Sequence, residues 1–227
     1  MTTTPTYEPL PLRTEDGRIH PAFGFLAIHR ALRRDAERFV VAAPTALADR
    51  EAHAALAAHW ERYRELLEFH HRFEDAQLLP LMRREAPELS PLLDEMAAEH
   101  HDLDELLPRI TAIVRSERPD APAAGAAFES LSGLLHPHLA AEEVHLVPVM
   151  ERVFGSRNGD GGPDGGERRE GGPAQNPDHP EFWVPWMGEQ LEEDLVAESL
   201  ATLPEEHRAA YPRWLEEYRA GLARWVP

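Results

Sequence analysis

Residues 70–82 read HHRFEDAQLLPLM, and residues 138–150 read HLAAEEVHLVPVM. The two stretches lie 138 − 70 = 68 positions apart, and in that register a histidine, two successive acids, a leucine, a proline and a methionine recur. The first acid follows its histidine by four residues, as Glu74 follows His70 and Glu142 follows His138. On a helix, residues four apart project from one face about one turn apart, which suits an imidazole and a carboxylate that hold one metal ion. The repeat therefore predicts a duplicated helix with a His-x-x-x-Glu pair in each copy.

The composition narrows the class of protein. The 227 residues can bury one good core, and 23 basic against 41 acidic side chains give a net charge of 23 − 41 = −18. This charge repels nucleic acid and anionic lipid, so neither is an expected partner. Because the chain has no cysteine, any metal must be held by nitrogen and oxygen atoms. No basic or apolar leader and no membrane-spanning run is found, so we expect a cytoplasmic protein.

Four long segments with helical periodicity follow one another in the first two thirds of the chain. Proline-containing breaks separate them, and no alternation of apolar and polar residues indicates strands. The expected helices cover 21–42, 46–86, 90–117 and 122–154, with Thr45 and Ser90 as candidate N-caps. Short connections between long amphipathic helices favour an all-α fold, an antiparallel up-down four-helix bundle.

The composition also divides the chain into four parts. Residues 1–17 are interpreted as an N-terminal arm, 18–154 as the bundle, 155–180 as a flexible linker and 181–227 as a C-terminal helical extension. The linker holds eight of the 14 glycines and no large apolar residue, so it cannot form a core. Four of the five tryptophans lie in the extension. Because exposed tryptophans are costly, we expect the extension to pack on the bundle or to join two subunits in a homodimer.

One histidine of each expected helix lies on its apolar face. These histidines are His29, His70, His100 and His138, and two of the faces also carry Glu74 and Glu142. Burying two carboxylates without partners is costly, so the fold must supply cations or a metal. A single inward histidine is more often a hydrogen-bonded core residue than a ligand. Six ligand-type residues at matching heights, however, favour a metal site.

The other histidines are expected away from this site. His71 and His101 fall about 100° from the apolar faces, so we expect both to face solvent. Five more have no carboxylate at ligand spacing on an apolar face and are interpreted as surface or capping residues: His53, His59, His136, His179 and His207. His145 lies near the second glutamate and is either a donor to a ligating carboxylate or a packed core histidine.

The set of candidate ligands limits which metal ions, and how many, could be bound. Four imidazoles and two carboxylates are too rich in nitrogen for calcium or magnesium and too many for one tetrahedral zinc ion. A pair of iron or manganese ions bridged by both carboxylates would use all six. In these residues the chain resembles the hemerythrin-like, HHE cation-binding family, whose helices carry in order a histidine, a His-x-x-x-Glu pair, a histidine and a second His-x-x-x-Glu pair. The resemblance covers residues 20–154.

The resemblance implies two nonheme iron ions, with manganese or zinc as alternative occupants. One iron would be bound by His29 and His70, the other by His100 and His138, with Glu74 and Glu142 as bridges. Oxygen-carrying members have another histidine four residues after the third-helix ligand, where this chain has Asp104. We interpret Asp104 as a weak additional ligand or as a solvated side chain. Either reading argues against simple reversible oxygen carriage.

The resemblance also implies chemistry with dioxygen, peroxide or nitric oxide. The first hypothesis is a diiron protein that senses or disposes of reactive oxygen or nitrogen species, for example by decomposing peroxide. The second is a non-enzymatic, iron- or oxygen-responsive module whose extension changes its packing when the site is loaded. The third is a diiron oxidase that acts on an organic substrate and needs an apolar pocket reaching the irons. The sequence leaves enzymatic activity open.

Overall fold

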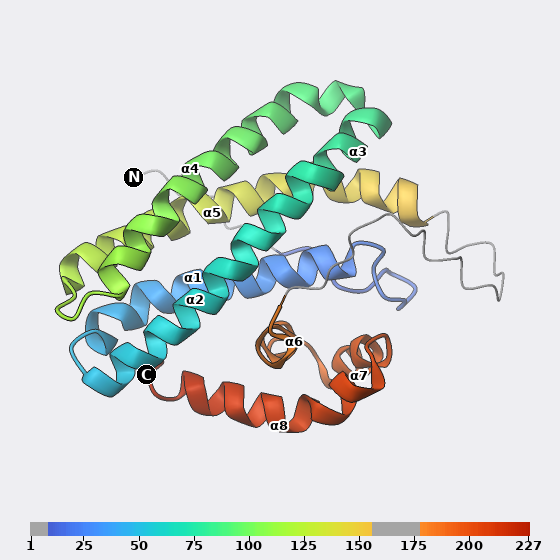
Figure 1. Ribbon diagram of the computed structural model, residues 1–227. Helices are drawn as coiled ribbons and strands as arrows, with labels where there is room; N and C mark the ends of the chain where they lie inside the picture. Colours follow the sequence, from blue (N-terminus) through green and yellow to red (C-terminus); the bar gives the residue numbers. More distant parts are fainter. Residues whose placement is uncertain (1–8, 156–177) are drawn as a thin grey trace.

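The computed structural model describes residues 9–155 and 178–227, which are predominantly helical (Figure 1). The helices are α1 (Phe23–Ala46), α2 (Arg50–Phe73), α3 (Leu79–Glu85), α4 (Ser90–Val114), α5 (Ala121–Met150), α6 (Pro180–Gly188), α7 (Glu193–Ala201) and α8 (Glu205–Leu222). Within these two ranges there is no strand, only one isolated β-bridge between Arg13 and Ile19. The prediction of an all-α fold is therefore confirmed.

Four long helical segments form a bundle. Helix α1 packs against α2 and α5, and α4 packs against the same two helices, so the four segments enclose a common interior (Figure 1). A π-helical turn, Glu74–Leu78, joins α2 to α3 without a break. Such turns are frequent at functional sites, and this one begins at the glutamate of the first repeat copy.

The helix boundaries differ from the expected ones around the first connection. Helix α1 continues through Pro44, and Thr45 donates its hydroxyl to a backbone carbonyl of α1. The N-cap of α2 is Asp49, whose carboxylate accepts hydrogen bonds from two backbone amides of the first turn, both at 2.9 Å. The prediction of Thr45 as the cap was wrong, because the aspartate satisfies the free amides of a helix that starts later. Ser90 begins α4 but makes no side-chain cap.

Two apolar cores fill the bundle. The first contains Phe39, Trp60 and Phe128, and the second contains Leu26 and Met96. The two cores occupy different heights along the same long helices. A layer of the bundle between them is therefore left for polar side chains.

The extension, helices α6–α8, packs on α1 and α2. Its Trp186 and Trp225 are buried in the first core, where Trp225 stacks on Phe39 with the ring centroids 5.3 Å apart. Among the described residues, burial within one chain thus accounts for both indole rings. Of the predicted linker, positions 156–177 lie outside the described residues.

A buried charged network fastens the extension to α1. Asp35 is fully buried; its Oδ2 accepts a hydrogen bond from Trp186 Nε1 at 2.7 Å and lies 2.6 Å from His59 Nε2. Arg38 donates two hydrogen bonds to Glu189 of the extension, both at 2.8 Å. The expectation of a surface or capping role for His59 was wrong, because the extension covers it.

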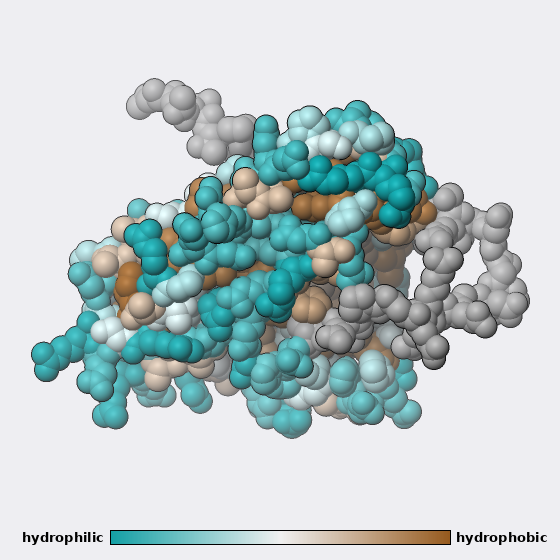
Figure 2. All heavy atoms as spheres, turned by 45° about the horizontal axis from the view of Figure 1, so that its top comes forward, coloured by the Kyte–Doolittle hydropathy of each residue, from teal (hydrophilic) through white to brown (hydrophobic). Residues whose placement is uncertain are grey.

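The surface is largely polar. Figure 2 shows hydrophilic side chains over most of one face, with apolar ones visible among them. The large apolar side chains that are exposed in the described ranges are Val41, Phe73, Leu134 and Val144. No helix among the described residues combines the length and the apolar character that crossing a membrane requires.

Candidate metal centre

The six residues singled out by the sequence lie together in the layer between the two cores. They are at most 4% exposed: His29, His70, Glu74, His100, His138 and Glu142. In α1 the layer falls after Leu26 of the second core and before Ala31 of the first. The other three long segments cross from one core to the other at the same height. We call these six residues the polar layer.

The side of the polar layer next to α1 joins two imidazoles and two carboxylates. His29 Nε2 lies 3.1 Å from His70 Nε2 and 3.5 Å from Glu142 Oε2. His70 Nε2 lies 3.3 Å from Glu74 Oε1, its partner one turn later. One potential ligand atom from each of these four residues falls within 4.8 Å of the others. This spacing is small enough for one metal ion to be shared.

The side next to α4 repeats the arrangement with the same two carboxylates. His138 Nε2 lies 3.2 Å from Glu142 Oε1, and His100 Nε2 lies 3.5 Å from Glu74 Oε2. These four residues form a second group whose ligand atoms lie within 4.8 Å of one another. Each glutamate thus turns one oxygen to either side. Such a placement suits two carboxylates that bridge two cations.

The unsatisfied polar atoms of the layer fit a bound cation. Both carboxylate oxygens of Glu74 and of Glu142 are buried and have no hydrogen-bond partner among the described residues. The same is true of Nε2 in His100 and His138. Buried polar atoms are rarely left unpaired, because each costs free energy. Bound metal ions would supply partners for these clustered carboxylate oxygens and imidazole nitrogens.

The electrostatics of the layer agree with this interpretation. Burial, reinforced by the charge of Glu142, raises the pKa of Glu74 well above its ordinary value. Burial also acts to raise the pKa of Glu142, but interactions with His100 and His138 outweigh it and hold that pKa well below its ordinary value. Burial lowers the pKa of His29 to about 3, so its imidazole is neutral at pH 7. Without a cation, burial thus favours the protonated form of Glu74, and a bound metal would favour the carboxylate.

Carboxylates outside the layer orient its histidines. His29 Nδ1 lies 3.0 Å from Glu143, His100 Nδ1 lies 2.9 Å from Asp75, and His138 Nδ1 lies 2.8 Å from Glu99. An Nδ1–H that donates to a carboxylate leaves Nε2 unprotonated toward the centre and fixes the ring. Asp75 and Glu143 are the second acids of the two repeat copies. The sequence showed their recurrence, but their role became evident only from the helix packing.

Two histidines lie where the sequence did not place them. His71, expected in solvent, is 1% exposed and stacks on His100 with the ring centroids 4.3 Å apart. His145, expected at a ligating carboxylate or in the core, is exposed. The prediction that His101 faces solvent is confirmed, since its side chain is 74% exposed. Asp104 is half-exposed, and its Oδ1 lies 3.4 Å from His71 Nδ1.

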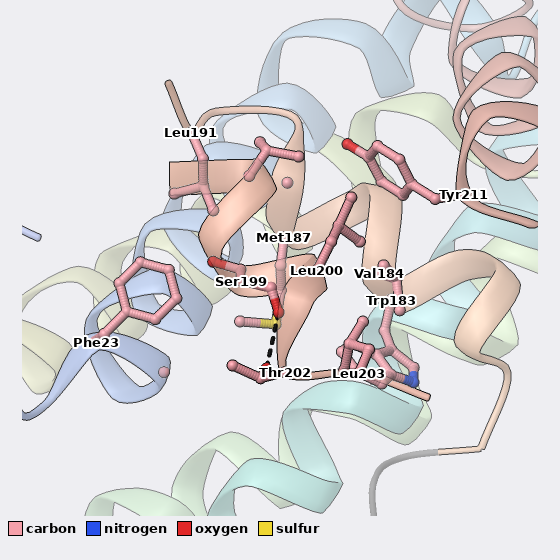
Figure 3. Close-up of a pocket in the computed structure, with 13 residues that line it drawn as sticks. Phe23, Trp183, Val184, Met187, Leu191, Ser199, Leu200, Thr202, Leu203 and Tyr211 are labelled. Atoms are coloured by element: carbon pink, nitrogen blue, oxygen red, sulfur yellow. Dashed lines mark hydrogen bonds between the residues drawn. The ribbon is translucent and has the colours of Figure 1, made fainter. Parts of the chain in front are cut away.

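An apolar pocket lies apart from the polar layer (Figure 3). It has a volume of about 220 Å³ and lies between the first turn of α1 and the extension, with Phe23, Trp183, Met187, Leu200 and Tyr211 among its lining residues. No residue of the polar layer lines it. This pocket therefore does not provide the route to the metal centre that an oxidase of organic substrates would need.

Comparison with known proteins agrees with the geometry. A family model described as the hemerythrin HHE cation binding domain matches residues 20–150, which is more than half of the chain. The matched range contains the whole polar layer, whereas the extension lies outside it. No curated protein and no solved structure is significantly similar to the chain.

Proposed function

Because the chain belongs to the hemerythrin HHE cation-binding domain family, we propose that its polar layer binds two nonheme iron ions and reacts with a small oxidant. One ion would be held by His29 and His70, the other by His100 and His138, with Glu74 and Glu142 shared. The observation that carries the proposal is the position of the two glutamates. Each presents one unpaired oxygen to either pair of histidines.

We also infer that the four long segments form the antiparallel up-down bundle of the sequence prediction.

Iron suits the donors. Imidazole and carboxylate ligands are acceptable to iron, manganese and zinc, so the donor set alone leaves manganese and zinc as alternatives. When bound, an iron pair supplies one- and two-electron chemistry toward dioxygen, peroxide or nitric oxide. We propose that the protein senses or disposes of such species. Peroxide decomposition is the enzymatic form of this proposal.

The chain itself contributes orientation and the exclusion of water. The polar layer is closed above and below by apolar cores, so little solvent reaches the carboxylates. The imidazole of His29 is fixed between α1 and Glu143, and that of His100 between α4 and Asp75. A site so enclosed admits small ligands more readily than large ones.

A second candidate function, a non-enzymatic sensor, is favoured by how the extension is attached. Asp35, which binds the extension, lies on the same helix as His29. A change in the position of α1 on metal loading or oxidation would therefore reach the extension directly. Hydrogen exchange of α6–α8 in the metal-free, ferrous and ferric protein tests this candidate. Unchanged exchange rates across the three states would exclude it.

Metal content and the optical spectrum test the main proposal. Protein from iron-supplemented cells should contain about two irons per chain and show a near-ultraviolet band that bleaches on reduction and changes with peroxide. Replacement of His138 by alanine should abolish the band, whereas His101→Ala, an exposed histidine near the site, should leave it unchanged. A folded, helical protein without metal would refute the proposal.

A further inference from the structure

We infer that His71 is a fifth imidazole ligand of this centre, on the side of His100 and His138, and that Asp104 orients it. The inference rests on the proposed function, because it concerns the same metal pair. It differs from the ligand set implied by the sequence, in which the second side of the centre has only two imidazoles. It also assigns Asp104 the role of a positioning residue.

The position of His71 is that of a ligand. Its potential ligand nitrogen lies within 4.8 Å of those of His100 and His138, and all three side chains are buried. The ring stacks nearly parallel on His100, with an interplanar angle of 14°. It meets His138 edge-on, with the ring centroids 5.9 Å apart. His71 therefore lies against both histidines that would bind the second ion.

The second ring nitrogen of His71, Nε2, has no bonding partner among the described residues. Its Nε2 is buried without a hydrogen-bond partner there, as are Nε2 of His100 and His138. A core histidine that served only packing would leave this nitrogen unpaired at a cost in free energy. Three unpaired imidazole nitrogens in one buried group are instead satisfied together by one cation. The unpaired oxygens of Glu74 and Glu142 in the same layer support the same interpretation.

Asp104 supports this role from outside the layer. Its Oδ1 lies 3.4 Å from His71 Nδ1, and about half of its side chain is exposed. Asp104 belongs to none of the three groups of candidate ligand residues. If His71 Nδ1–H donates to Asp104, the unprotonated Nε2 is available to bind a metal ion. Asp75 orients His100 in the same way, and Glu99 orients His138. The three imidazoles on this side are then each oriented by a carboxylate.

The place of α2 in the bundle explains how neighbouring residues can serve two ions. Helix α2 contacts α1 on one side and α4 on the other. Successive helical residues project about 100° apart. His70 therefore reaches the side of His29, while His71 reaches the side of His100. The centre receives two imidazoles on the α1 side and three on the α4 side.

Metal titration with a matched pair of variants tests the inference. The metal-free wild type, His71→Ala and His101→Ala are titrated with Co²⁺ under argon, and bound metal and the visible spectrum are recorded. His71→Ala should lower the affinity for one of two equivalents by at least about tenfold and change the spectrum of that equivalent alone. His101→Ala should titrate like the wild type. Circular dichroism of the metal-free proteins checks that both variants fold. If His71→Ala does not fold, His71→Gln, which keeps the side-chain size, takes its place.

Rescue by free imidazole separates a ligand from a packing residue. Added imidazole should restore the spectrum of the weakened equivalent in His71→Gly, since a small ligand can enter the vacated position. Asp104→Asn should weaken the same equivalent less than loss of His71 does, and Asp102→Asn should not. Two normal equivalents in His71→Ala would overturn the inference and leave the proposed function standing. Absence of binding in the wild type would overturn both.

Discussion

At the scale of single residues, the two shared glutamates distinguish metal binding from simple core packing. Glu74→Gln keeps the shape of the side chain but removes the charge that would hold cations. We expect bound iron to fall from about two per chain to less than one, while the metal-free protein keeps its Tm or gains a few degrees. The gain follows because burial disfavours the carboxylate, as the raised pKa of Glu74 shows. Elemental analysis and thermal unfolding measure both effects. A substitution of a half-exposed acid in the preceding helix α2, Glu65→Gln, should change neither.

The second acids of the repeat should influence metal affinity without binding metal. Asp75→Asn weakens the hold on His100, and Glu143→Gln weakens the hold on His29. Each should lower metal affinity by about 10- to 100-fold, which competition with a chelator measures. Asp75 is half-exposed, so its loss should cost little stability, whereas Glu143 is buried and also pairs with Arg33. The loss of the Glu143 carboxylate should lower the unfolding free energy by about 1–3 kcal/mol. Wild-type affinity in both variants would show that the histidines need no such support.

The six residues singled out by the sequence lie together, but the sequence did not indicate all of their neighbours. The six residues that it singled out do come together, because each lies on the apolar stripe of its helix. His71 escaped notice because a single stripe describes a helix with one buried face, whereas α2 faces both α1 and α4. His145 was misplaced for the opposite reason. The buried residues of that part of α5 include 142, 143, 146 and 147, a face that turns away from position 145.

At the scale of elements, the four long helices could be predicted because their apolar periodicity is strong and prolines mark the connections. The exact ends could not, since Pro44 does not stop α1 and Asp49 outcompetes Thr45 as a cap. The π-helical turn at Glu74–Leu78 also left no visible signal in the sequence. Its extra residue shifts the register after Glu74, so the apolar stripe before and after the site cannot be extrapolated as one line.

The contact between α1 and the extension should depend on pH through Asp35. Burial acts to raise the pKa of Asp35, but His59 and Arg34 outweigh it and hold this pKa far below 3.8, its ordinary value. Because the folded-state pKa is the lower one, the stabilisation is complete above about pH 4 and declines as the pH falls further. Asp35→Asn should lower the unfolding free energy by about 3–5 kcal/mol at pH 7 and reduce the decline below pH 4.

Urea unfolding at intervals from pH 7 to pH 3 measures this dependence. Glu37→Gln, which alters an exposed acid on the same helix, serves as the control and should follow the wild type. An Asp35→Asn curve parallel to that of the wild type below pH 4 would mean that other carboxylates cause the acid sensitivity.

At the scale of the whole molecule, the sequence did not determine which surface the tryptophan-rich extension covers. Its composition predicted that it covers an apolar surface, but composition cannot say whether that surface belongs to the same chain or to a second copy. The packing places Trp186 and Trp225 in the first core, where Trp225 stacks on Phe39. Family similarity ends at residue 150, so no comparison could have supplied this contact.

Because one core contains side chains of both the bundle and the extension, we expect them to unfold as one unit. Tryptophan fluorescence reports mainly on the extension, which holds four of the five tryptophans, and the absorption of bound metal reports on the polar layer. Both signals should be lost at the same temperature, in a single transition. Metal at 100 times its Kd should raise the unfolding free energy by about 2.7 kcal/mol and shift both signals together. Loss of the fluorescence signal at a lower temperature, with the metal spectrum intact, would instead show that the extension detaches from a stable bundle. Such independent detachment would weaken the link between α1 and the extension on which the sensor hypothesis depends.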